Sequence, residues 1–121
     1  MARLCHTTVN DIERNRIEYA KNFASTYSCI VVLKGANTIV AAPDGRVFFN
    51  LTGNAGMATG GSGDVLSGMI ASYLAQGESP LKSTLNAVYF HGFAGDRAAD
   101  KFTERSLLPS DIIEELKYIP Y

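Results

Sequence analysis

The sequence has almost no excess of either charge and no long hydrophobic run. Its 11 basic and 12 acidic residues leave a formal net charge of -1. Proteins that bind the phosphate backbone of nucleic acids usually carry a clear basic excess, so this composition argues against that class. Apolar runs such as residues 29–33 are much shorter than the ~20 residues that a membrane-spanning helix requires. We therefore expect no nucleic-acid partner and no membrane partner.

Cysteine is also scarce. The 2 cysteines, Cys5 and Cys29, lie at no spacing typical of a metal or redox site, which favours reduced thiols in a cytoplasmic protein. Residues 1–6 have no long apolar segment after their arginine, so they do not resemble a secretory signal peptide. We assign no metal-ligating residue and expect a cytoplasmic location.

The composition that remains is that of one ordinary globular domain, with 121 residues, 46% apolar and 19% charged. Thr8 is placed to cap a first helix, with Asp11 at the third position after it. Residues 29–33 form a continuous, largely β-branched run, typical of a strand buried on both faces of a parallel sheet. Residues 38–41 and 47–49 flank the turn signal Pro-Asp-Gly and predict a β-hairpin. The apolar positions of the first helix are Val9, Ile12, Ala20, Phe23 and Tyr27.

Three further helices are predicted after residue 61. The first covers residues 62–76 and is stopped by Gly77, and the second covers 79–103 with Ser79 as its cap and Pro80 in its first turn. The third is capped by Ser110 and runs through Leu116. The first two carry apolar stripes at Val65, Leu66, Met69, Ile70, Tyr73 and Leu74, and at Leu81, Leu85, Val88, Gly92, Gly95, Ala99 and Phe102.

Glycine and histidine within these helices are interpreted as structural. Gly92 and Gly95 are expected to be close-packing positions, and His6 and His91 lie at no spacing typical of metal ligands or a catalytic triad.

The order of elements is α/β, but one central strand and a hairpin cannot cover the apolar faces of these helices. The sheet is therefore expected to be completed by another chain or by another part of a larger domain.

The glycine-rich loop before residue 64 is the strongest functional signal. Glycines 60, 61 and 63 let the backbone approach an anion closely, at the helix end where unpaired N–H groups and the helix dipole favour phosphate. The P-loop pattern fails because Ser62 replaces its lysine, and the dinucleotide pattern fails because Leu66 replaces its last glycine. Asp64 is either a plain helix-start carboxylate or a general base beside a bound phosphate.

The segment 54–68, NAGMATGGSGDVLSG, resembles the signature of the ADP/ATP-dependent NAD(P)H-hydrate dehydratases of the ribokinase-like superfamily. Segments 32–38, 42–45 and 91–96 resemble further family segments in the same order. The resemblance implies a ribokinase-like three-layer α/β sandwich. Because family members are about twice as long, it also implies that residues 1–121 are the C-terminal part of a single such domain, with an incomplete sheet. A homo-oligomer, or association with an N-terminal half, would complete that sheet.

The resemblance further implies a metabolite-repair reaction: dehydration of hydrated NADH or NADPH, driven by ADP or ATP with Mg2+. In that reaction Asp64 binds the substrate and takes the proton from its hydroxyl, while N–H groups from Gly61, Ser62, Gly63 and Asp64 stabilise the transferred phosphoryl group. Family analogy places Lys34, Gly35, Ala36, Asn37, Thr38 and Gly63 at the nucleotide.

Two alternatives remain open at this point. A small-molecule kinase of the same superfamily, acting on a vitamin precursor or a sugar, would use the glycine loop and Asp64 equally well. A fragment that binds nucleotide without turnover is the other, because half of the expected domain is absent. Lys34 also has a plain interpretation as an exposed lysine at a strand end.

Overall fold

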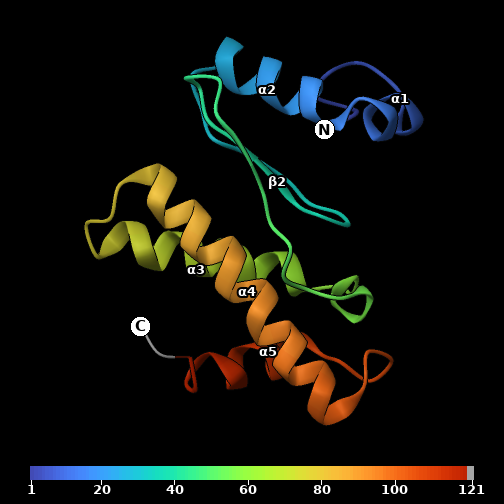
Figure 1. The fold of residues 1–121 in the computed structure, drawn as a ribbon, viewed down its shortest axis with the longest axis vertical. Helices are drawn as coiled ribbons and strands as arrows, with labels where there is room; N and C mark the ends of the chain where they lie inside the picture. Colours follow the sequence, from blue (N-terminus) through green and yellow to red (C-terminus); the bar gives the residue numbers. More distant parts are fainter. Residues whose placement is uncertain (120–121) are drawn as a thin grey trace. The chain divides into compact units, whose positions relative to one another are not determined.

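The computed structural model describes residues 1–119, which fall into two compact units (Figure 1). The first unit is Met1–Asn50 and the second begins at Leu51. In the part of the chain that the structure describes, no helix has the length and apolarity needed to cross a bilayer.

The first unit packs helices on a small sheet. It contains α1 (Val9–Arg14), α2 (Arg16–Thr26), β1 (Val31–Leu33), β2 (Ile39–Ala41) and β3 (Val47–Phe49). The Thr8 cap is confirmed, since its side chain accepts a hydrogen bond from the Asp11 amide at 3.1 Å. The expected single helix is interrupted at Asn15, whose backbone leaves the helical region. The core of this unit consists of Ala20, Ala24, Val31, Ile39 and Ala41, so α2 covers one face of the sheet.

The sheet of this unit corrects one prediction. The hairpin of β2 and β3 is confirmed, with Val40 opposite Phe48. The strand at residues 29–33 is shorter than expected and pairs antiparallel with β2, with Val32 opposite Val40, so the prediction of a parallel strand was wrong for the described residues. The loop between β1 and β2 is only five residues long by these bounds, whereas a parallel connection needs a dozen residues or more. The β-branched run reflects burial against α2 and does not encode strand direction.

The second unit is helical, with the short 3-10 helix η1 (Ala55–Met57) before α3 (Ser62–Ala75), α4 (Pro80–Phe102) and α5 (Pro109–Leu116). Gly77 has the left-handed φ of 88° that ends α3, as predicted. Ser79 occupies the N-cap of α4, although its side chain makes no capping hydrogen bond. The prediction for Ser110 was wrong. Leu108 is the N-cap of α5 and Pro109 fills the first helical position, which suits a residue without an N–H.

Helix α4 lies against both α3 and α5, which explains its buried positions (Figure 1). The expected stripe is buried at Val88, Gly92 and Gly95, but Phe102 at its end is 49% exposed. A second buried face, which the stripe did not include, packs on α5. The core there consists of Ala94, Ala98, Leu107, Ile112 and Ile119. In α3, Leu66 is the one buried member of the predicted stripe within the described residues.

Candidate functional site

The glycine loop enters α3 through a left-handed turn. Gly61 is the N-cap of α3, with φ 93° and ψ −21°, a conformation that glycine adopts without steric cost. Its carbonyl accepts from the amides of Asp64 at 3.0 Å and Val65 at 3.1 Å, which closes the first turn. Asp64 therefore stands in the first turn of the helix, and its side chain is exposed. Both the loop and the carboxylate lie where the sequence places them.

The backbone amides of this loop are not equivalent. The Ser62 amide donates to the Thr59 carbonyl at 3.3 Å, and the Asp64 amide donates to Gly61. Within residues 1–119, the amides of Gly60, Gly61 and Gly63 have no hydrogen-bond partner. These three donors lie at the positive end of the α3 dipole and are available to an anion. The four-residue set expected from the resemblance is thus divided into free and engaged amides.

Space around the loop differs from glycine to glycine. A Cβ at Gly60 would meet nothing within 4 Å, so this side of the loop is open. A Cβ at Gly61 would lie 3.1 Å from the Pro109 ring, so there the backbone rests against the start of α5. An anion can therefore approach from the Gly60 side.

His91 of α4 fixes the start of α3. Ser62 is 1% exposed and His91 is 5% exposed, so both are buried. The His91 Nε2 atom lies 2.9 Å from the Ser62 carbonyl oxygen and 3.4 Å from its Oγ. Since a carbonyl only accepts, Nε2 carries the proton. His91 therefore contacts the glycine loop, 29 residues away in sequence, a contact that spacing could not indicate. Its assignment as a purely structural residue stays a prediction. His6 is exposed.

The loop at residues 34–38 belongs to the first unit, where Arg16 holds it. The Arg16 guanidinium, at the start of α2, donates to the carbonyls of Ala36 at 2.6 Å and Leu33 at 3.1 Å. Gly35 and Asn37 have positive φ values of 150° and 55°, and Thr38 donates through Oγ1 to the Gly35 carbonyl at 3.3 Å. The first four of the five predicted nucleotide-site residues are exposed: Lys34, Gly35, Ala36 and Asn37.

A cleft of about 740 Å³ follows α3 from Asp64 to Gln76 and reaches α5. Among the described residues that line this cleft, Asp64 alone carries a carboxylate. The others are Val65, Gly68, Met69, Ser72, Tyr73, Gln76, Ile113 and Leu116. A carboxylate beside free amides can take a proton from a substrate hydroxyl while an anionic partner lies at the helix start.

The described residues contain no group of three His, Cys, Asp or Glu side chains arranged to hold a metal ion. Mg2+ in phosphoryl-transfer sites often takes one or two carboxylates and completes its shell with phosphate oxygens and water. Asp64 is exposed beside the free amides, and as the candidate base it would contact the ion through water, with nucleotide oxygens as the direct ligands.

Known proteins are similar to this chain in sequence and in fold. Residues 1–118 match the family model described as NAD(P)H-hydrate dehydratase. A bifunctional NAD(P)H-hydrate repair enzyme of Moorella thermoacetica is 44% identical over 119 residues, which is 98% of this chain and 22% of that protein. The ADP-dependent (S)-NAD(P)H-hydrate dehydratase of Bacillus subtilis is 40% identical over 114 residues, 94% of this chain and 41% of that protein.

Solved structures agree with the sequence matches. The chain superposes on the ADP/ATP-dependent NAD(P)H-hydrate dehydratase of Bacillus subtilis, co-crystallised with ATP and Mg2+, with a TM-score of 0.93 and 38% identity. That match covers 97% of this chain and 43% of the other. A ribokinase-like superfamily protein of Enterococcus faecalis gives a TM-score of 0.72 at 37% identity, over 81% of this chain and 34% of the other. The chain thus has the ribokinase-like fold class and spans less than half the length of these relatives.

Proposed function

The chain belongs to the NAD(P)H-hydrate dehydratase family, and on that premise we propose that it carries the phosphoryl-transfer site of an enzyme that dehydrates hydrated NADH or NADPH. The adenine nucleotide, ADP or ATP, is the co-substrate. The observation that carries the proposal is the position of Asp64, exposed in the first turn of α3, beside the unpartnered amides of Gly60, Gly61 and Gly63. A base and an anion cradle are both needed to transfer a phosphoryl group to a hydroxyl.

In the proposed reaction, the Asp64 carboxylate takes the proton from the hydroxyl of the hydrated nicotinamide ring. The hydroxyl oxygen forms a bond to the terminal phosphorus, and the bond from that phosphorus to the rest of the nucleotide breaks. The free amides stabilise the charge on the transferred group. Phosphate then leaves the ring carbon, a proton leaves the neighbouring carbon, and the ring double bond is restored. The sum is loss of one water from the hydrate and hydrolysis of one phosphoanhydride bond.

Binding of the nucleotide is assigned to two segments. In the second unit, Gly60, Gly61 and Gly63 receive phosphate oxygens through their amides. In the first unit, a contact of residues 34–38 with the nucleotide is proposed from the family alone. Mg2+, where bound, would neutralise charge on the phosphates, and Asp64 would contact it through water.

We also propose that residues 1–121 are the C-terminal part of a single ribokinase-like domain. The matched relatives are longer, and the shares of their length that the chain covers, 41% and 43%, support this assignment. The cleft along α3 supports it too, because its largely apolar lining is suited to packing against further protein. A homo-oligomer or an N-terminal half would supply that surface. We place the protein in the cytoplasm.

The experiment that tests the function compares Asp64→Asn with Asp100→Asn. Asp100 is an exposed carboxylate on α4, so its amide variant controls for loss of charge. The chain is supplied with the N-terminal part of the Bacillus subtilis relative, hydrated NADH, and ADP or ATP with Mg2+, and recovered NADH absorbance is followed. Asp64→Asn should lower turnover roughly a hundredfold or more while nucleotide affinity changes little. Near-normal turnover in that variant would remove Asp64 from the mechanism.

The same assay separates this function from its two alternatives. A small-molecule kinase would accumulate a stable phosphorylated product, whereas the dehydratase releases inorganic phosphate and restores NADH. A fragment without activity would bind nucleotide but release no phosphate in any combination of the two parts.

A further inference from the structure

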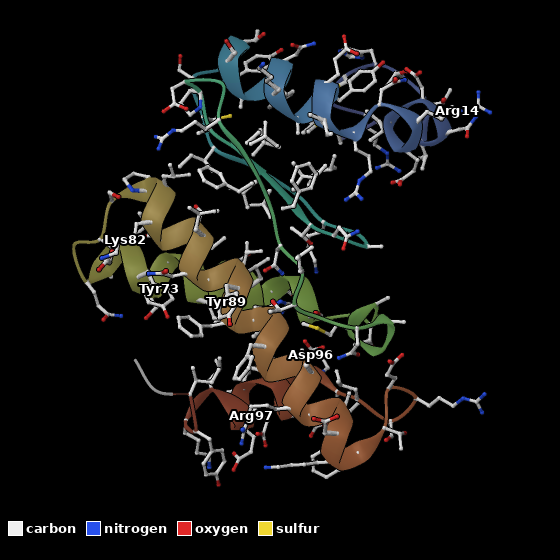
Figure 2. The ribbon with its side chains drawn as sticks, in the orientation of Figure 1. Arg14, Tyr73, Lys82, Tyr89, Asp96 and Arg97 are labelled. Carbon is white, nitrogen blue, oxygen red and sulfur yellow. The ribbon has the colours of Figure 1, made fainter. Side chains whose placement is uncertain are left out.

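The segment that leads into the glycine loop lies against α4 (Figure 2). Thr52 donates through Oγ1 to the Tyr89 carbonyl at 2.9 Å. Gly92 and Gly95 make room for this segment, since a Cβ at Gly92 would lie 2.7 Å from the Thr52 carbonyl carbon. A Cβ at Gly95 would lie 2.7 Å from the Met57 Cε. The part of α4 around Gly92 and Gly95 therefore receives residues 52–57.

Asp96 closes this contact with two hydrogen bonds. Its Oδ2 accepts from the Gly53 amide at 2.8 Å, and its Oδ1 accepts from the Asn54 Nδ2 at 2.9 Å. The Asn54 Oδ1 accepts in turn from the Gly56 amide at 3.0 Å, at the start of η1. Gly53 adopts the left-handed φ of 104°. A single carboxylate thus orients both the turn and the side chain that caps η1.

The residues between this anchor and α3 are joined by short-range backbone bonds. Met57 donates to Asn54, Ala58 to Ala55, and Ser62 to Thr59. The first two bonds hold residues 54–58 in one turn and the third holds residues 59–62 in the next, so the two turns follow one another directly in the chain. The position of residues 60–63 is therefore set at one end by His91, through Ser62, and at the other end by Asp96.

We propose that Asp96 is a positioning residue of the glycine loop: through Gly53 and Asn54 it holds residues 53–61 in the conformation that leaves the amides of residues 60, 61 and 63 open. That an adenine nucleotide is the ligand of these amides rests on the proposed function. The role of Asp96 in ordering the loop does not depend on the ligand.

Exchanging the two polar side chains gives a sharp test. In Asp96→Asn, one acceptor oxygen becomes a donor, so either the Gly53 amide or the Asn54 Nδ2 faces another donor. In Asn54→Asp, two carboxylates face each other. In the double variant Asn54→Asp with Asp96→Asn, the amide now at position 96 donates to the carboxylate now at position 54 and accepts from Gly53. That carboxylate still accepts from Gly56, so all three hydrogen bonds are restored with no change in net charge.

Hydrogen exchange of the 121-residue chain, read by mass spectrometry, measures the order of the loop. In Asp96→Asn the exchange of the Gly53, Ser62 and Asp64 amides should rise roughly tenfold or more, since hydrogen bonds to a charged group are strong. The double variant should return to the wild-type rates, and the control Asp100→Asn should not differ from wild type. Exchange of the Ala98 and Ile112 amides, in the core between α4 and α5, should stay unchanged and so exclude global unfolding.

Calorimetry with ATP and Mg2+ adds the second measurement. Affinity should fall roughly tenfold in Asp96→Asn and recover in the double variant. A rise in exchange confined to Gly53, with Ser62 and Asp64 unaffected, would overturn the proposal. Failure of the double variant to restore the wild-type rates would overturn it as well. If the wild-type chain binds no ATP even when it is combined with the N-terminal part of the Bacillus subtilis relative, the proposed function fails at this site, while the exchange rates still decide the role of Asp96.

Discussion

Two glycines in helix interiors are expected to respond to alanine in opposite directions. Alanine is favoured over glycine in a helix by about 1 kcal/mol. At Gly68 of α3 a Cβ would meet nothing within 4 Å, so Gly68→Ala should stabilise the chain by about 0.5–1 kcal/mol. At Gly92 of α4 a Cβ would lie 2.7 Å from both the carbonyl carbon and the carbonyl oxygen of Thr52, and closer still to its Oγ1.

The backbone of Thr52 cannot rotate away from such a contact, so the segment must move. Overpacking of this kind costs about 1–3 kcal/mol, and loss of the bond from Thr52 to the Tyr89 carbonyl adds about 1 kcal/mol. After the helix-propensity gain, Gly92→Ala should destabilise the second unit by about 1–3 kcal/mol. Gly95→Ala should cost less, because its nearest neighbours are the flexible end of Met57.

Urea denaturation of the three variants, followed by circular dichroism and by exchange of α4 amides, measures these differences. The free energy of unfolding should be higher than that of the wild type in Gly68→Ala and lower in Gly92→Ala. Equal stabilisation by both substitutions would show that residues 52–57 do not lie on α4 in solution.

Four further outcomes are expected. The Lys101 ammonium, and to a smaller extent the Arg97 guanidinium, hold the pKa of the buried Glu115 below its ordinary value of 4.5. The ionised carboxylate therefore stabilises the fold above about pH 4.5. This stabilisation is lost as the pH falls through the lowered pKa. Glu115→Gln should therefore flatten the acid limb of the stability curve, measured by thermal melts from about pH 2 to about pH 7, and an unchanged limb would contradict the assignment. Gly63→Val should weaken nucleotide binding in calorimetry, whereas unchanged affinity would place the phosphate elsewhere. Arg16→Ala should raise the KM for nucleotide more than it lowers kcat in the two-part assay, and equal changes would speak against a role for the loop at residues 34–38. The chain alone should self-associate in sedimentation and lack dehydratase turnover, and a compact, active monomer would refute the half-domain interpretation.

The sequence predicted those elements whose signals are local. Thr8 capped its helix, the Pro-Asp-Gly turn joined β2 to β3, and Gly77 ended α3, because each feature depends on residues within one turn. The direction of β1 depends instead on its partner strand, and a β-branched run carries no information on that. Both Ser110 and Pro109 are residues that often begin a helix. In the structure Pro109 occupies the first position of α5, which suits a residue without an N–H, so the helix begins before Ser110.

The candidate site divides in the same way. The positions of Asp64 and its glycines at the start of α3 were predictable, since the glycines precede a run with helical spacing, whereas their roles stay a proposal. The side chains that hold the site were not, because Arg16 contacts residues 17 and 20 positions away, His91 a residue 29 away, and Asp96 residues 42 and 43 away. Spacing rules address neighbours on one element and cannot find such pairs.

These three side chains share a physical role. A loop rich in glycine gains close approach to an anion but has few side chains of its own with which to hold a conformation. Each loop is therefore held by side chains of a helix. Arg16 and His91 donate hydrogen bonds to loop carbonyls, and Asp96 accepts hydrogen bonds from loop amides. Charged or buried polar groups make strong, directional bonds to the backbone, so few of them are needed. In the second unit the glycine loop therefore depends on α4, and in the first unit the loop at residues 34–38 depends on α2, so substitutions at these anchors should act on affinity without touching the ligand.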